Sequence, residues 1–545
     1  MPRRLYALAA LALSTLIVCG CGRSPQPAAP GSTAAQGATL LVGNGPGPDS
    51  LDPQKARVNE AHQVLRDLYE CLTSLDKQAA PAPGVATSWD ASADGLTYTF
   101  HLRPEARWSN GDQVVAADFL AALRRLVDPA TASQYAQVVD VIVNASAIIA
   151  GKAPVDSLGV NAPDDSTLLV HLAGPAPYLP GLLAHPSTCP VHRATLARYG
   201  ADFARPGNMV SNGAFVLKEW VPGSHVLAVR NRHYWNDKAT LLEAVRYLQI
   251  ADENAELTRY RAGELDVTAV VPRGQFDWIR ANLGAELHIF PQLNTYYYGF
   301  NMNRAPFKDH PGLRRALSLV IDREKLAARV LRVGELPAYG WVPPGIHDYT
   351  PQSFDYRGRA MADRIAEARR LYAAAGYSQS HPLVIELRYN DGEIHTKLAI
   401  AVSSMWQEAL GVQTRLVAVE FKSLLQDIDR GDVEIFRSSW SGDYNDAYTY
   451  AQYLKSDFGI NLPHYRNPQY DALLQQAAAA VDVAARRSLL EQAERLALAD
   501  HPLMPLYFYV NKHLVKPNVT GWYDNVLNVV YSKDLGLKAR AAAAP

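Results

Sequence analysis

PGVATSWD at residues 83–90, TYTFHLR at 97–103, WSNGD at 108–112 and ADF at 117–119 form the most informative part of this chain. Residues 97–103 alternate polar and apolar side chains and are rich in β-forming types, which predicts a strand. From Asp118 to Val127 the apolar side chains recur at helical spacing, and Asp128-Pro129 then ends the predicted helix. A half-buried strand is therefore followed by an amphipathic helix.

The same mixture continues toward the C-terminus. Residues 364–375 (RIAEARRLYAAA) predict an amphipathic helix that Gly376 ends, and residues 484–500 predict a second long helix. Between them, LVIELRY at 383–389 predicts a strand, and Asn390-Asp391-Gly392 a turn. Interleaved helices and strands favour an α/β architecture with more than one sheet.

Length and charge restrict the functions that are possible. The chain has 545 residues, more than a single hydrophobic core usually organises, so two or more folded units are expected. Without residues 1–20 the chain keeps 51 basic and 54 acidic residues, a net charge of −3, and it has no basic run. This balance argues against nucleic acid and against an anionic membrane surface as partners.

The first residues predict export. Arg3 and Arg4 precede a short apolar stretch at 5–18, which is too short to span a bilayer. The residues around Cys21 resemble a lipobox, so residues 1–20 are predicted to be a lipoprotein signal peptide and Cys21 the lipidated residue. Residues 21–38 are then the lipid anchor and a flexible tether rich in Pro, Ala, Gly and Ser. The alternative is a plain secretory signal with incidental cysteines.

Two further cysteines, Cys71 and Cys189, lie far apart in the sequence. In an oxidising compartment they form either a disulfide or two separate buried thiols, and the sequence does not distinguish these alternatives.

Motifs for catalysis are missing from the sequence. It contains no H-E-x-x-H, C-x-x-C or G-x-S-x-G motif, and its histidines are scattered. Residues 43–48 (GNGPGP) resemble a phosphate loop but lack its last glycine and its lysine, so a turn is the better interpretation. We therefore expect neither an enzyme nor a cofactor, although a triad assembled from distant residues remains the alternative.

Aromatic side chains gather near single charges. Trp440, Tyr444, Tyr448 and Tyr450 lie close in sequence to Arg437 and Asp443, and tyrosine-rich runs occupy 296–298 and 507–509. Aromatic walls with a few placed charges suit a cavity for organic ligands. The alternative is that these tyrosines simply pack the core.

The block at 83–119 resembles the signature of the peptide/nickel class, family 5, of solute-binding proteins of ABC importers. Its oligopeptide-binding members are similar nearly from end to end. Further matching stretches, in the same order, are SLDP at 50–53, VDPATAS at 127–133, HPST at 185–188, RYRAGE at 259–264, PAYG at 337–340, HTKLAI at 395–400, GDYN at 442–445 and YVN at 509–511.

This resemblance implies a monomeric α/β protein with the periplasmic-binding-protein fold (type II, cluster C), whose lobes close about a hinged ligand cleft. Lobe I is expected to comprise 39–69, 194–294 and 511–537. An inserted domain II covers 70–193, and lobe III covers 295–510. The implied function is to capture short peptides in the periplasm of a Gram-negative cell envelope and to deliver them to the permease and ATPase of an ABC importer.

The resemblance also implies the binding residues. Asp443 matches the carboxylate that holds the peptide α-ammonium, and Arg437 and His395 match positions that meet the C-terminal carboxylate. The segment 437–443 would pair with the peptide backbone as an added strand does. Tyr135, Phe421, Trp440, Tyr444 and Tyr509 are the expected aromatic lining. Each of these residues also has a purely structural interpretation.

Several positions depart from the oligopeptide-binding pattern. A glutamate, an arginine and a lysine of that pattern are replaced by Arg57, Ile428 and Leu331, and two disulfide-forming cysteines by Asn294 and Ser441. The preferred peptide length is therefore expected to differ. The alternatives are a murein tripeptide or another zwitterionic metabolite as ligand, a hydrolase, and a lipoprotein that binds no ligand.

Overall fold

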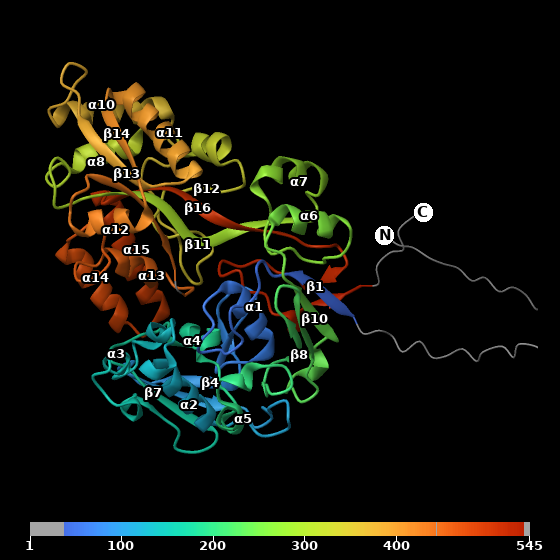
Figure 1. Ribbon diagram of the computed structural model, residues 1–545. Helices are drawn as coiled ribbons and strands as arrows, with labels where there is room; N and C mark the ends of the chain where they lie inside the picture. Colours follow the sequence, from blue (N-terminus) through green and yellow to red (C-terminus); the bar gives the residue numbers. More distant parts are fainter. Residues whose placement is uncertain (1–37, 443, 539–545) are drawn as a thin grey trace, which may run out of the picture. The chain divides into compact units, whose positions relative to one another are not determined.

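A computed structural model describes residues 38–442 and 444–538 (Figure 1). The predicted signal peptide, Cys21, the tether up to residue 37, and Asp443 lie outside the described residues. None of the helices within the described ranges combines the length and the apolar character that crossing a bilayer requires.

A four-stranded sheet is built from distant parts of the first half of the chain. Its strand order is β1-β10-β9-β8, with β1 parallel to β10 and the other pairs antiparallel. The helix α1 packs against β8 and β9. The bounds are β1 Thr39–Gly43, α1 Asn59–Leu68, β8 Phe215–Val221, β9 His225–Arg230 and β10 Ala244–Leu248.

The residues between α1 and β8 form a second, fully antiparallel sheet with strand order β4-β5-β7-β6. β5 (Thr97–Leu102) and α2 (Ala116–Val127) confirm the strand and the helix predicted there. Trp108 is fully buried, and its Nε1 donates to Oδ2 of Asp118 at 3.2 Å, which ties the loop to the first turn of α2. The other elements are β2 Thr73–Leu75, β3 Pro81–Pro83, β4 Ala86–Ala91, α3 Ala145–Ile149, β6 Val160–Asn161, β7 Thr167–His171, α4 Leu179–Leu182 and α5 Arg193–Tyr199.

Cys71 and Cys189 are joined by a disulfide, with 4.2 Å between their Cα atoms. The bond settles the alternative that the sequence leaves open. It links the chain just before the second sheet to the chain just after it, so it closes a loop that contains that whole sheet.

The second half of the chain forms a six-stranded mixed sheet with strand order β12-β16-β11-β15-β13-β14. The pairs of β13 with β14 and with β15 are parallel, and the others are antiparallel. Strand β13 confirms the strand predicted at 383–389, shifted by one residue. The bounds are β11 Leu287–Phe300, β12 Leu336–Pro337, β13 Val384–Asn390, β14 Gln413–Val419, β15 Ile435–Ser441 and β16 Leu503–Leu514.

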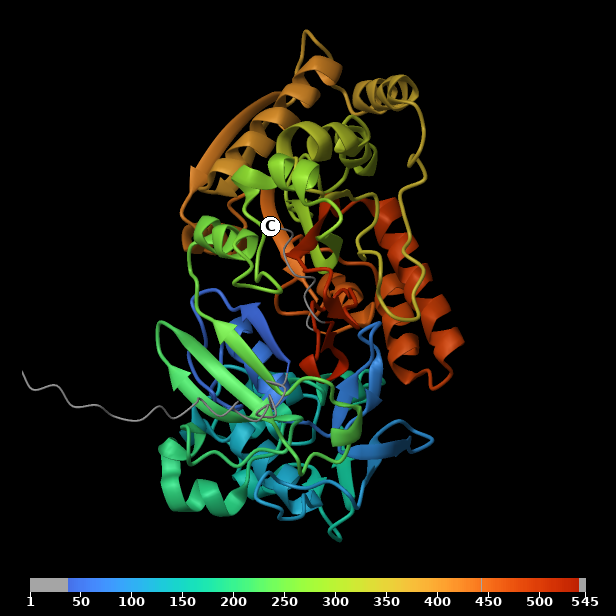
Figure 2. The ribbon, with the colours of Figure 1, turned by 90° about the vertical axis from the view of Figure 1, so that its right-hand side faces the viewer.

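Helices surround this sheet, as Figures 1 and 2 show in yellow, orange and red. The two predicted helices are present, and α10 begins three residues earlier than expected. The bounds are α8 Pro311–Leu319, α9 Arg323–Lys325, α10 Met361–Ala374, α11 Glu393–Leu410, α12 Phe421–Asp429, α13 Tyr448–Ala451, α14 Pro468–Ala479 and α15 Val483–Asp500.

Two long neighbouring strands connect the halves. β11 and β16 run antiparallel from a small core around α6 (Glu253–Arg261) and α7 (Phe276–Asn282) into the two cores that flank the large sheet. Their pairing is interrupted between Pro291 and Thr295. The C-terminal residues return to the first half and form β17 Val519–Thr520 and β18 Gly536–Leu537.

Candidate functional site

A cavity of about 950 Å³ is lined by residues from both halves of the chain. One wall comes from α1 and from the segments around the second sheet. The opposite wall comes from the chain after β12, from the end of β15 and the segment that follows it, and from α15. The lining residues used below are His62, Arg66, Tyr135, Asp140, Tyr178, His185, Asp348, Ser441, Gly442, Tyr444, Asn445, Asp446, Arg486 and Arg487. Its volume and mixed polarity suit a small organic ligand.

The strand β15 leads into this cavity and has an open edge. Ser441 and Gly442 line the cavity, and residues 435–441 pair on one side with β11. On the other side, β13 pairs with Ile435 and Phe436. Within the described residues no strand continues that ladder along 437–441. Backbone groups of β15 are therefore available to an extended ligand, because an exposed strand edge pairs with an added strand.

Arg437 lies at the beginning of the open edge and is buried, with 7% of its surface exposed. Its guanidinium donates to Oδ1 of Asn390 at 2.9 Å and to the hydroxyl of Tyr509 at 3.3 Å, and it lies 4.5 Å from the ring centre of Tyr296. Its Nε has no hydrogen-bond partner. Among the described residues no carboxylate forms an ion pair with it. A buried cation without a counter-charge is costly, so this arrangement suits an anionic ligand group.

His395 stands beside this cation at the start of α11. Its Nδ1 lies 3.2 Å from the hydroxyl of Tyr296, and the two rings stack with their centres 5.7 Å apart. Burial, assisted by the charge of Arg437, lowers the pKa of His395 to about 4. The imidazole is therefore neutral near pH 7 and becomes protonated more readily when a carboxylate approaches.

The predicted aromatic residues fall into different places. Tyr444 and Tyr135 line the cavity on opposite walls. Trp440 packs on Tyr453, with ring centres 4.8 Å apart, and its Nε1 donates to the Thr449 carbonyl at 2.9 Å.

Five of the predicted site residues do not line the cavity itself: Arg437, His395, Tyr509, Phe421 and Trp440. Arg437, His395 and Tyr509 form their own cluster beside the open edge of β15. Phe421 also does not line the cavity; it lies at the start of α12 with 49% of its surface exposed. Asp443 is outside the described residues, but its neighbours Gly442 and Tyr444 both line the cavity.

Contacts between the two walls involve residues that sequence reasoning missed. The ring of Tyr178 stacks on that of Tyr444 at 4.3 Å, and Nδ2 of Asn445 donates to the carbonyls of Gln78 and Ala79 at 3.1 and 3.0 Å. His62 and Arg66 were missed as well. Their spacing of four residues on one helix was the only available signal, since that spacing places them on one face.

No set of three or more His, Cys, Asp or Glu side chains within residues 38–442 and 444–538 is arranged to hold a metal ion.

Comparisons with known proteins identify the family. The model for "Bacterial extracellular solute-binding proteins, family 5 Middle" matches residues 80–461. The chain is 40% identical to the periplasmic oligopeptide-binding protein OppA of Escherichia coli (strain K12), over 90% of this chain and 91% of OppA. It is 42% identical to the probable deoxycholate-binding periplasmic protein YgiS of the same organism, over 90% of this chain and 92% of YgiS.

A solved structure agrees with the sequence comparison. The unliganded open form of the periplasmic murein tripeptide-binding protein MppA superposes with a TM-score of 0.89 at 38% identity, over 92% of this chain and 98% of that one. The α/β fold predicted from the resemblance is therefore confirmed, and this chain belongs to the family 5 bacterial extracellular solute-binding proteins.

Proposed function

We propose that this protein is a periplasmic receptor that captures short peptides by their termini and backbone and delivers them to the permease and ATPase of an ABC importer. In this proposal it is a monomer without catalytic activity or cofactor, held to the membrane through lipid on Cys21. The observation that carries the proposal is the buried guanidinium of Arg437, which no described carboxylate neutralises.

A peptide supplies the missing charge. Its C-terminal carboxylate would accept hydrogen bonds from Arg437, including from the unpartnered Nε, with His395 alongside. At the other end of the open edge, Asp443 follows directly on Gly442 and would meet the α-ammonium. The ligand would then run antiparallel to β15, with its backbone paired to that strand. This explains how varied side chains are accepted.

The distance between the two ends of the open edge also suggests the length of the bound peptide. Residues 437–442 of an extended strand span about 17 Å, which is the reach of a peptide of about five residues. Peptides longer than this would have to leave the cavity at one end. Lobes I, II and III, with the boundaries predicted from the sequence, belong to this proposal, and the ligand would stabilise their closed arrangement.

A murein tripeptide is a second candidate ligand. It is favoured by the similarity to the murein tripeptide-binding protein MppA, which superposes with a TM-score of 0.89.

Native mass spectrometry tests the proposal. Mature protein made without its lipid should carry co-purified masses of two to five residues, released intact on denaturation. Asp443→Asn and Arg437→Gln should each lose them, and a control variant at an exposed arginine, Arg280→Gln, should keep them. If ligand-free protein binds no member of a mixed peptide library but does bind deoxycholate, the proposal of peptide capture is wrong. If the added peptides are cleaved, the proposal that the protein lacks catalytic activity is wrong.

A further inference from the structure

Arg66 is a further cation that lines the cavity, on the wall opposite β15. It lies one helical turn after His62 on α1, so both side chains project from the same face of that helix. The rings of Tyr135 and His185 contact His62 with centres 5.0 and 4.7 Å away.

The acidic residues next to Arg66 in sequence are engaged elsewhere. Glu70 accepts hydrogen bonds from Tyr234 and Trp235 at 2.6 Å and pairs with Lys533 at 3.2 Å. Asp67 accepts hydrogen bonds from the Tyr247 hydroxyl and from the backbone nitrogen of Ser532.

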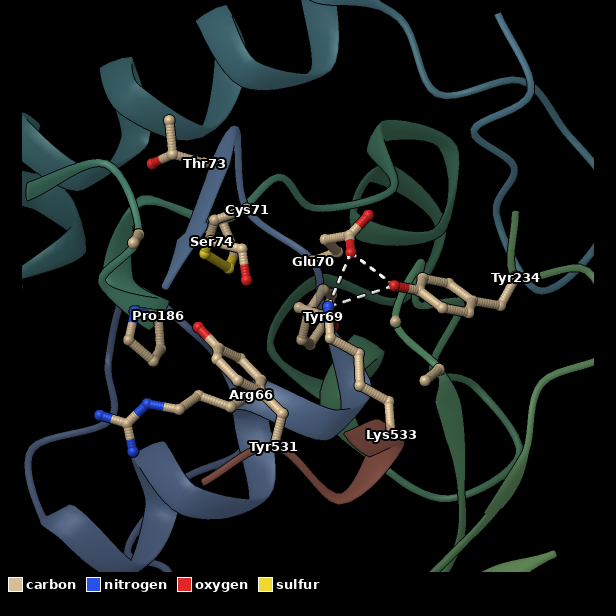
Figure 3. Close-up of a pocket in the computed structure, with 14 residues that line it drawn as sticks. Arg66, Tyr69, Glu70, Cys71, Thr73, Ser74, Pro186, Tyr234, Tyr531 and Lys533 are labelled. Atoms are coloured by element: carbon tan, nitrogen blue, oxygen red, sulfur yellow. Dashed lines mark hydrogen bonds and ion pairs between the residues drawn. A yellow bond between two sulfur atoms is a disulfide. The ribbon is translucent and has the colours of Figure 1, made fainter. Parts of the chain in front are cut away.

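Figure 3 shows the guanidinium of Arg66 extending away from the cluster of Glu70, Tyr234 and Lys533. Within the described residues no hydrogen bond or ion pair joins that guanidinium to a protein group.

The acidic residues that line the cavity also leave Arg66 without a partner. Asp446 pairs with Arg486 at 2.7 Å, and Asp348 pairs with Arg487 at 2.7 Å. Asp140 lines the cavity too, and no ion pair links it to Arg66. Of the cavity arginines, Arg486 and Arg487 are thus neutralised by the protein, whereas Arg66 is not.

The histidines around Arg66 do not offset its charge. Burial, together with the positive charge of Arg66, lowers the pKa of His62 to about 4. Burial also lowers the pKa of His185 well below its usual value, with smaller effects of His62 and Arg66. Both rings are neutral near pH 7, and the buried Nε2 of His62 has no hydrogen-bond partner. The rings that surround Arg66 are therefore neutral, and no ion pair within the described residues compensates its guanidinium.

We propose that Arg66 binds a second anionic group of the ligand, separate from the C-terminal carboxylate assigned to Arg437. The preferred ligands are then peptides that carry an additional carboxylate, as an acidic side chain does. This inference rests on the proposed function and specifies its substrate class. The planar guanidinium is suited to such a group because it can donate two parallel hydrogen bonds to one carboxylate.

Pairs of tripeptides that differ only by Glu or Gln at one position test this by calorimetry on ligand-stripped protein. At one position the Glu peptide should bind roughly tenfold tighter or more than its Gln partner. Arg66→Gln should remove this preference while the affinity for the Gln peptide stays within about a factor of two. Arg66→Lys should keep part of the preference, and the exposed control Arg280→Gln all of it.

The outcomes separate this inference from the proposed function. If the unmodified protein binds the Glu and Gln peptides with equal affinity, the role proposed for Arg66 is wrong, whereas peptide capture still stands. If Arg66→Gln lowers the affinity for Glu and Gln peptides equally, the role proposed for Arg66 is also wrong. Arg66 would then contact a group that all peptides share. Failure of both peptide classes in the unmodified protein overturns the proposed function and this inference together. The Glu–Gln comparison in the unmodified protein does not depend on whether a variant folds.

Discussion

Asn294 and Ser441 face each other across β11 and β15, and Nδ2 of Asn294 donates to Oγ of Ser441 at 2.8 Å. The family resemblance implies cysteines at both positions in oligopeptide-binding relatives. Opposed residues of an antiparallel pair have Cα atoms about 4.5–5.5 Å apart, which lies within the range that a disulfide spans. Here a hydrogen bond replaces a covalent link, two residues before Asp443.

The double variant Asn294→Cys/Ser441→Cys should therefore form a disulfide without rearrangement. Chain entropy predicts a stabilisation of about 5 kcal/mol, because the bond closes a loop with a sequence separation of 147. Thiol titration and thermal melting with and without reductant measure this. Two free thiols in air-oxidised, folded protein would contradict the expected pairing.

Arg437→Met should weaken peptide binding by about 2–5 kcal/mol while leaving the ligand-free protein as stable as before, or more stable. The reason is that the ligand-free fold buries this charge without a described counter-charge. Thermal melts of the unmodified protein and of Arg437→Met measure the stability, and calorimetric titrations measure the peptide affinity. The matched control is Arg466→Met, at an exposed arginine. A large loss of stability without ligand would mean that Arg437 serves the fold.

Peptide binding should take up protons through His395. Its pKa is about 4 in the free protein, and a carboxylate beside it would raise that pKa. Between pH 7 and pH 5 the complex then holds more protons than the free protein, so affinity rises as pH falls. Calorimetry in buffers of different ionisation enthalpy measures the uptake. His395→Gln should abolish most of it, and unchanged uptake in that variant would assign the protons to another group.

Removing the Cys71–Cys189 disulfide should destabilise the region around the second sheet. The bond closes a loop with a sequence separation of 118, for which chain entropy predicts about 4–5 kcal/mol. In protein lacking residues 1–21, reductant should lower the melting temperature of the unmodified form to that of Cys71→Ser/Cys189→Ser. The variant itself should not respond to reductant. An unmodified protein that melts identically with and without reductant would contradict this.

Local patterns predicted the individual elements well. Residues 97–103 and 118–127 carry strong periodicity, and the structure contains β5 and α2 there, within two residues at each end. The sequence resemblance predicted the family, because ordered motifs across the chain are specific even where each one is short. The state of Cys71 and Cys189 was not predictable, because it depends on the distance between chain segments that tertiary structure brings together.

The site was predicted less completely. Arg437 and His395 were identified by resemblance, and the structure brings both against Tyr296. Arg66 was missed because an arginine in an amphipathic helix is usually expected to lie on the solvent-exposed face. Its unusual state depends on Glu70 being engaged by Tyr234 and Lys533, which come from distant segments. Pairing of this kind is not visible in local sequence.

The paired strands β11 and β16 have a mechanical consequence. Each crosses from the small core around α6 and α7 to the cores of the large sheet, and their ladder is interrupted between Pro291 and Thr295. A double ribbon held by hydrogen bonds on both sides of a gap resists sliding and stretching, and it bends most easily at the gap. Any relative motion of the two ends is therefore expected to be a bend at this interruption rather than a slide of one strand along the other.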